Sequence, residues 1–340
     1  MSSPLPRLSD LGFEEIPDDY YEDQMLSVYF PLFRLPDIVI GEILKNWSHK
    51  EILFVVQTSL RARRLISKHK IRTKLSVVDA EYDFYFQISY DHKEPFKIDI
   101  VTRGDNFDSF WLFQYFIPVR YQGNMLVSRW KEAIHAFQQI LEFLDDVFRI
   151  KEISFEIKPY LSGRAVPIVE YVASRNIKFG SVHWSKFCGS DEMAGRFLMA
   201  SKTASDLNFK GLYSNTFRFD HFHLFRMDNL IISNASWMTL KNILALRNCK
   251  QVYLGEAHMN TADINKILRE IIENSGKLQE LRMHSSYVVN MEEAIKDLEI
   301  SRIENANIMR EKKYWLTGNN GKQISATKLL IDVVEITIRT

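Results

Sequence analysis

The sequence contains little cysteine, glycine or proline, no long apolar run, and almost no excess of either charge. Two cysteines in 340 residues, Cys188 and Cys249, cannot form a disulfide framework or a cysteine-based zinc site. With 13 glycines and 9 prolines, the chain is neither collagen-like nor of low complexity. The 44 basic and 43 acidic side chains nearly cancel, so bulk charge indicates neither a nucleic-acid nor a membrane partner. The scarcity of cysteine favours a reducing compartment, cytoplasm or nucleus.

The sequence also lacks a stretch that could cross a membrane. The longest apolar stretch, residues 107–119, is interrupted by polar residues and by Pro118, whereas a span needs about 20 apolar residues. Residues 1–28 carry seven acidic side chains between Asp10 and Asp23 and have neither a basic nor an apolar signal region. We therefore expect no secretory signal and no membrane contact, and we interpret residues 1–28 as a disordered acidic tail.

Residues 29–74 show the pattern of a compact block of three helices. Pro36 precedes apolar residues at helical spacing, and proline is tolerated in the first turn because its missing N–H would have no partner there. Ser48 and Glu51 form a Ser-x-x-Glu capping box, which predicts the start of a second helix. A third amphipathic stretch begins near Leu60. It contains a basic run that we expect to be a solvated helix face: Arg61, Arg63, Arg64, Lys68, Lys70, Arg72 and Lys74.

Residues 75–127 change to an alternation with a period of two, which is typical of strands. Residues 84–90 and 96–100 alternate apolar and polar side chains on either side of a predicted turn. An aromatic stretch follows at 107–116. Base stacking would require interleaved basic residues, which this stretch lacks, so we expect its rings to pack against a sheet face.

Residues 128–291 alternate predicted helices and strands, and the later strands recur with a period. The strand positions Ile231, Tyr253 and Leu281 lie 22 and 28 residues apart, in or near the period of leucine-rich repeats. Short strands joined by single helices favour parallel pairing, because a parallel connection needs a long crossover. We interpret this region as an irregular, leucine-rich-repeat-like α/β domain.

Residues 292–340 are predicted to form a C-terminal β cap. Two apolar-rich stretches flank the Gly318-Asn319-Asn320-Gly321 segment, which is a strong turn signal and predicts a hairpin. The expected fold class is thus α+β: a three-helix block and an N-terminal β segment, followed by the repeat-like α/β domain and its cap.

The stretch FPLFRLPDIVIGEILKNWSHKEILFVVQTSLRARRLISKHK, residues 30–70, resembles an F-box, the three-helix module that docks onto a Skp-family adaptor. The resemblance covers Pro31-Leu32, Arg34-Leu35-Pro36, the helix at 39–44, the helix start at 48–51 and Ser59. It implies adaptor binding by seven residues: Pro31, Leu32, Leu35, Pro36, Ile40, Ile43 and Leu44. Apart from Leu44, we expect these residues to be partly exposed, because a block this short has more apolar positions than its own core needs.

A second stretch, residues 216–283, resembles the F-box-associated type 2 domain that is typical of nematode F-box families. Its landmarks include Thr216-Phe217, Asn234-Ala235-Ser236-Trp237 and Asp263-Ile264-Asn265. The stretch departs from the family pattern at Arg247, which interrupts the usual Leu-Asn-Cys run, at Ile271, where Trp is expected, and at Gly276-Lys277, where Asn-Pro is usual.

Together the two resemblances imply a substrate-recruiting adaptor subunit of a Skp–cullin–F-box ubiquitin ligase. The expected partners are a Skp-family adaptor, a cullin bound through it, and an unknown protein target recruited by the C-terminal part. No cofactor, metal or catalytic group is expected. One alternative is a repeat-type interaction module that acts outside any ligase, with its helical block packed only on the chain itself. Another is a nucleic-acid binder acting through the basic run, which lacks an accompanying groove-reading motif.

Two other signals have plainer interpretations. Asp220, His221 and His223 could alternate along a strand as metal ligands, but a site needs three or more ligands and no cysteine is near in sequence. We expect a structural histidine pair. Cys249 has no evident base beside it, so a buried inert thiol is the default.

Overall fold

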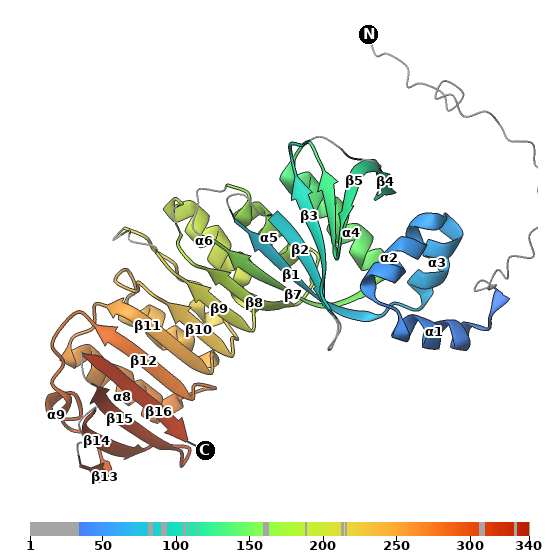
Figure 1. Ribbon diagram of the computed structural model, residues 1–340. Helices are drawn as coiled ribbons and strands as arrows, with labels where there is room; N and C mark the ends of the chain where they lie inside the picture. The colour runs from blue at the N-terminus through green and yellow to red at the C-terminus, as the bar shows by residue number, and fades with distance from the viewer. Residues whose placement is uncertain are drawn as a thin grey trace, which may run out of the picture.

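A continuous mixed sheet runs through the described part of the chain, with helices packed along it (Figure 1). The structure is a computed structural model, and it describes residues 34–80, 84–89, 94–104, 107, 109–113, 115–158, 163–187, 189–211, 214, 216–305, 310–329 and 332–339. Within these ranges, 16 strands follow the order β13-β14-β15-β16-β12-β11-β10-β9-β8-β7-β1-β2-β3-β6-β5-β4. The strands of the expected β segment, α/β region and C-terminal cap therefore share one sheet. No helix of the described ranges is both long enough and apolar enough to cross a membrane.

The N-terminal block consists of α1 (Asp37–Asn46), α2 (His49–Thr58) and α3 (Leu60–Lys68). The Ser48–Glu51 capping box is present, so the predicted start of α2 is confirmed. The Ser59 hydroxyl accepts a hydrogen bond from the backbone N–H of Ala62 and caps α3. The prediction that helical structure continues toward Lys74 is wrong. The chain leaves α3 at Lys68 and enters β1 (Arg72–Asp79).

The β segment that follows contains β2 (Phe84–Ser89), β3 (Phe96–Val101), β4 (Ser109–Leu112), β5 (Phe116–Gln122) and β6 (Met125–Arg129). In β2 and β3, buried and half-buried residues alternate as expected. The expectation that the aromatic stretch packs inward is confirmed for Trp111 and Phe113, which are buried. It is wrong for Phe110, Tyr115 and Phe116, which are exposed. Phe110 and Phe116 belong to β4 and β5 at the end of the sheet.

The α/β region then begins with α4 (Ala133–Val147), β7 (Arg149–Ile157), α5 (Ala165–Ser174), β8 (Phe179–Trp184), α6 (Asp191–Ala200) and β9 (Asp206–Phe209). It continues with β10 (Asn229–Ile232), α7 (Leu240–Ala245), β11 (Gln251–Ala257), α8 (Thr261–Asn274) and β12 (Glu280–Ser285). Neighbouring strands from β7 to β12 pair in parallel, which confirms the predicted pairing. Short 3-10 helices lie at Ser201–Thr203, Phe222–Leu224 and Leu246–Asn248.

One register prediction is wrong by a single residue. Ile231 pairs with Tyr253 as expected, but Tyr253 pairs with Arg282 rather than with Leu281. Leu281 pairs with Val252 on the buried face. The side-chain period of a strand is two, so this slip exchanges a solvent-facing position for a core position.

The cap contains α9 (Met291–Ala294), β13 (Ile300–Glu304), β14 (Arg310–Thr317), β15 (Gln323–Leu329) and β16 (Val333–Arg339). β14 and β15 form the predicted hairpin around residues 318–321, where Gly321 adopts a φ of 78°. β16 pairs antiparallel with β12 and so continues the sheet beyond the parallel strands.

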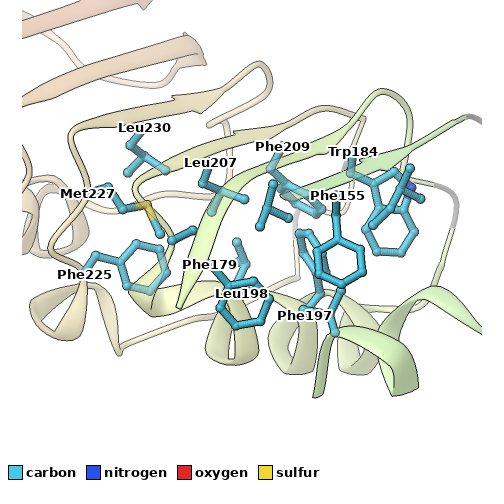
Figure 2. Close-up of a cluster of buried hydrophobic side chains, with 14 of the residues drawn as sticks. Phe155, Phe179, Trp184, Phe197, Leu198, Leu207, Phe209, Phe225, Met227 and Leu230 are labelled. Atoms are coloured by element: carbon cyan, nitrogen blue, oxygen red, sulfur yellow. The ribbon is translucent and has the colours of Figure 1, made fainter. Parts of the chain in front are cut away.

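The core lies between the sheet and the helices that cover one of its faces. Figure 2 shows Phe197 and Leu198 of α6 lying beneath side chains of β7 to β9. The Phe197 ring packs edge-on against Trp184 with 4.7 Å between ring centroids, and it stacks on Phe209. A row of buried side chains crosses six strands in register: Val182, Leu207, Leu230, Val252, Leu281 and Ile336.

Candidate docking surfaces

The first helix, α1, presents apolar side chains to solvent as well as to the core. Ile40 and Leu44 are 1% and 0% exposed and pack with the main hydrophobic core. Ile38, in contrast, is 81% exposed, and Val39 is 38% exposed. Residues two apart on a helix differ by about 200° in direction, which explains why Ile38 and Ile40 lie on opposite sides. Together with the exposed Pro36, the Ile38 and Val39 side chains form a bare apolar patch, which we call the α1 patch.

The seven residues predicted to bind an adaptor divide into three groups in the structure. Pro31 and Leu32 lie outside the described residues. Leu35 and Ile43 are half-buried and Pro36 is exposed, in agreement with the expected partial exposure. Ile40 is fully buried, so the expectation of its partial exposure is wrong, and Leu44 is buried beside it. The predicted contact residues did not include Ile38 and Val39. The 200° step between Ile38 and Ile40 shows that they point in opposite directions, but the sequence does not show which of them points outward.

The helical block is anchored to the rest of the chain through α2 and α3. The Gln57 side chain donates to the Leu112 carbonyl at 3.2 Å and accepts from the Leu112 N–H at 2.8 Å, as a neighbouring strand would. Arg63 of α3 forms an ion pair of 2.7 Å with Asp146, and its guanidinium lies 4.8 Å from the centroid of the Phe143 ring. These contacts hold α2 and α3 against β4 and α4 and do not involve the α1 patch.

The face of the sheet opposite the helices forms a second candidate surface, which we call the open face. Two rows of side chains cross β8, β9, β10, β11, β12 and β16 in register. The first row is His183, Asn208, Ile231, Tyr253, Arg282 and Glu335. The second is Ser181, Asp206, Asn229, Gln251, Glu280 and Thr337. Except for the buried Glu335, these residues are half-buried or exposed, which gives a mostly polar surface.

Hydrogen bonds and ion pairs organise the polar groups of the open face. The Asn229 amide donates to the Asp206 carboxylate, and the Ser205 hydroxyl donates to the same carboxylate at 2.9 Å. The Arg282 guanidinium bridges Glu280 at 2.6 Å and Glu335 at 3.1 Å. Nearer to the helical block, the Lys74 ammonium donates a hydrogen bond to Glu152 and holds the pKa of that carboxyl below its ordinary value. Such pre-ordered polar groups can recognise a polar partner with little further loss of side-chain freedom.

The predicted histidine pair lies on the helix side of the sheet. His221 and His223 are exposed, with 6.1 Å between ring centroids, and His223 Nδ1 lies 3.3 Å from the Asp220 carbonyl. Asp220 and His221 line a wide groove of about 920 Å³ between α5 and α6. An Arg196–Glu170 ion pair of 2.6 Å also lies there. Within the described ranges, no group of three or more His, Cys, Asp or Glu side chains is arranged to hold a metal ion.

Cys249 is a core residue with no exposed surface. Burial raises the pKa of its thiol to about 11 from an ordinary value of 9.0. At neutral pH the side chain is therefore a neutral thiol. The thiolate, which is the nucleophilic form of cysteine, is disfavoured here.

Comparison with known proteins finds a similarity that spans most of the chain. The chain is 24% identical over 311 residues to the Skn-1 dependent zygotic transcript 15 protein of Caenorhabditis elegans, covering 86% of this chain and 88% of that relative. No family model matches the chain, and no solved structure matches it at a significant level. The F-box and F-box-associated resemblances therefore stay predictions.

Proposed function

We propose that this chain is a non-catalytic, substrate-recruiting adaptor subunit of a Skp–cullin–F-box ubiquitin ligase. Its helical block docks onto a Skp-family adaptor through the α1 patch, and its α/β region binds the protein target. The exposure of Ile38 is the observation that carries the proposal. An isoleucine that is 81% exposed beside a second exposed apolar residue is unfavourable in water unless a partner covers it.

The structure of the helical block supports this assignment in two further ways. Its three helices, with the capping box and the short connections, have the element order that an F-box resemblance implies. The contacts of Gln57 and Arg63 tie the block to the sheet, so a partner bound to α1 holds the α/β region in a defined position. Such a subunit acts only by positioning. It raises the effective concentration of a target near an enzyme that carries activated ubiquitin.

The proposed contact set differs from the one that the sequence suggested. We assign the adaptor contact to Leu35, Pro36, Ile38, Val39 and Ile43, the described apolar side chains of this segment that reach the surface. Ile40 and Leu44 support the patch from below. A charged substitution at Ile40 would therefore disrupt folding and could not test docking.

Binding of the full chain to a purified Skp-family adaptor, measured by calorimetry, tests the proposal. Burial of an isoleucine contributes about 1.5–3 kcal/mol, so Ile38→Asp should weaken binding by roughly 10- to 150-fold. Val288→Asp is the matched control, because Val288 is 80% exposed and lies after β12, remote in sequence and in sheet order from the helical block. Circular dichroism should show both variants folded. Equal binding by Ile38→Asp and by the unaltered chain would reject the assignment, as would no binding by the unaltered chain.

A second candidate function is a leucine-rich-repeat-like interaction module that acts outside a ligase. The in-register rows of the open face favour it, because they offer a recognition surface that does not depend on α1. Affinity purification of the full chain separates the two functions. A ligase subunit loses its adaptor, but keeps its other partners, on Ile38→Asp substitution. A free-standing module shows no partner that is sensitive to Ile38.

A further inference from the structure

The outward face of α3 is strongly basic, and two of its cations, Arg64 and Lys68, have no acidic partner among the described residues. Ala62 and Ile66 bury one side of α3, while Arg61, Arg64 and Lys68 are exposed on the other. Arg64 and Lys68 are four residues apart and so adjoin on the helix surface, where like charges repel. Among the described residues, no carboxylate forms an ion pair with Arg64 or Lys68.

This basic face also has an apolar contact point and a shallow hollow. Leu60, at the start of α3, is 59% exposed. Together with Arg64, Ser67 and Lys68 it lines a hollow of about 540 Å³ that extends to Asp146, whose carboxylate is already paired with Arg63. The surface therefore fits an acidic peptide that carries some apolar side chains.

A segment of that chemistry lies in the same chain, ahead of α1. Residues 10–23 contain seven carboxylates, no basic side chain, and apolar or aromatic residues that include Leu11, Phe13, Ile16, Tyr20 and Tyr21. Charge complementarity between this segment and the face of α3 is thus present within one molecule.

The described chain begins close to the basic face. Asp37, in the first turn of α1, lies 3.8 Å from His69 Nε2, immediately after α3, and Figure 1 shows α1 next to α3. Residues 24–33 could span at most about 35 Å, while the nine residues of α3 are about 13 Å long. The connecting segment is therefore long enough for residues 10–23 to reach any part of α3.

We propose that the acidic segment 10–23 docks onto the basic face of α3 of its own chain, with carboxylates facing Arg64 and Lys68 and an apolar side chain against Leu60. A tether of this length gives an effective concentration in the millimolar range, which favours this occupant over a second copy at ordinary protein concentrations. This inference is independent of the α1 patch.

Zero-length carbodiimide cross-linking of the full chain, read by mass spectrometry, tests the proposal. Lys68 should couple to acids of residues 10–23 at least tenfold more than Lys45 does. Lys45 is exposed on α1, the helix that directly follows the tail in the chain, so it controls for tethering alone. Arg64→Glu should lower the yield of Lys68 cross-links severalfold and leave the yield of Lys45 cross-links unchanged. Adding 1 M NaCl to the unaltered chain should have the same two effects. Lys266→Glu, on the exposed side of α8, is the matched charge-reversal control.

Three results would overturn the inference. Equal coupling at Lys68 and Lys45 would show that the tether alone brings the segment near. Cross-links between differently isotope-labelled copies would assign the basic face to a second chain. Retention of a labelled oligonucleotide that is lost on Arg64→Glu substitution, without a Lys68 cross-link, would assign it to nucleic acid.

Discussion

The orientation of α1 makes a quantitative prediction for two isoleucines that lie two residues apart. Ile40→Ala removes a side chain that is 1% exposed, and such truncations cost about 2–5 kcal/mol because they lose burial and leave a cavity. Ile38→Ala removes a side chain that is 81% exposed, and surface changes of this kind stay within about 0.5 kcal/mol. The two substitutions are chemically identical, so the difference between them depends only on which way each side chain points.

Hydrogen exchange of the full chain, followed by mass spectrometry on peptides that cover α1, measures this difference without requiring cooperative unfolding of the whole molecule. Ile40→Ala should lower the protection of the α1 amides by roughly 30- to 4,000-fold, the equivalent of 2–5 kcal/mol. Ile38→Ala should change it by about twofold at most. Amides of α8 serve as an internal control and should be unaffected in both variants.

The effect on adaptor binding should be the reverse of the effect on protection. Ile38→Ala should weaken binding while α1 stays protected, and any binding loss in Ile40→Ala should accompany loss of protection. Equal loss of α1 protection in both variants would refute the orientation of α1 described above, and with it the α1 patch.

Three further predictions concern other parts of the fold. Gly255→Ala places a Cβ 2.2 Å from the Ser233 carbonyl oxygen, so we expect destabilisation of about 1–3 kcal/mol and a lower thermal midpoint; an unchanged midpoint would contradict the close strand approach. In a Cys188→Ser variant, Cys249 should resist iodoacetamide at pH 8 until the protein unfolds. Its folded pKa of about 11 exceeds the ordinary 9.0, so the unfolded state loses the proton first, and this contribution should lower stability as pH rises from about 9 to 11. Ser48→Ala should cost about 1 kcal/mol in urea unfolding, whereas Ser48→Asp should largely restore the loss.

Local signals in the sequence predicted much of the fold because their physical causes are local. The Ser48 capping box needs only residues within one turn, and the alternation in β2 and β3 reflects burial of one face of each strand. The start of α7 does not follow from such local signals. Trp237 lies before the helix in a turn, with its indole N–H donating to the Asn234 carbonyl, and the helix begins only after Thr239. Apolar periodicity alone cannot show whether Trp237 lies in such a turn or in the first turn of the helix.

The failures in predicting the candidate sites have a different cause, since they depend on contacts between distant segments. Assigning Arg282 to the open face requires the register of β12 against β11, and a spacing count that is wrong by one residue selects Leu281 instead. In α1, the sequence shows consecutive apolar residues at 38–40. Only the packing of α2, α3 and the sheet decides that Ile40 lies inward and Ile38 outward.

The attachment of the helical block also bears on how the two candidate surfaces could work together. A block joined by a flexible linker would let the α/β region sample many positions relative to a partner on α1, and the effective concentration of a bound target would be spread over that volume. Here the paired hydrogen bonds of Gln57 to Leu112 and the Arg63–Asp146 ion pair join the block directly to β4 and α4. The open face belongs to the same continuous sheet, so a target bound there would be held in one orientation relative to a partner on α1. If the chain acts in a ubiquitin ligase as proposed, weakening this attachment should therefore impair ubiquitin transfer to a bound target. The effect should appear even when adaptor binding and target binding, each measured alone, are unchanged.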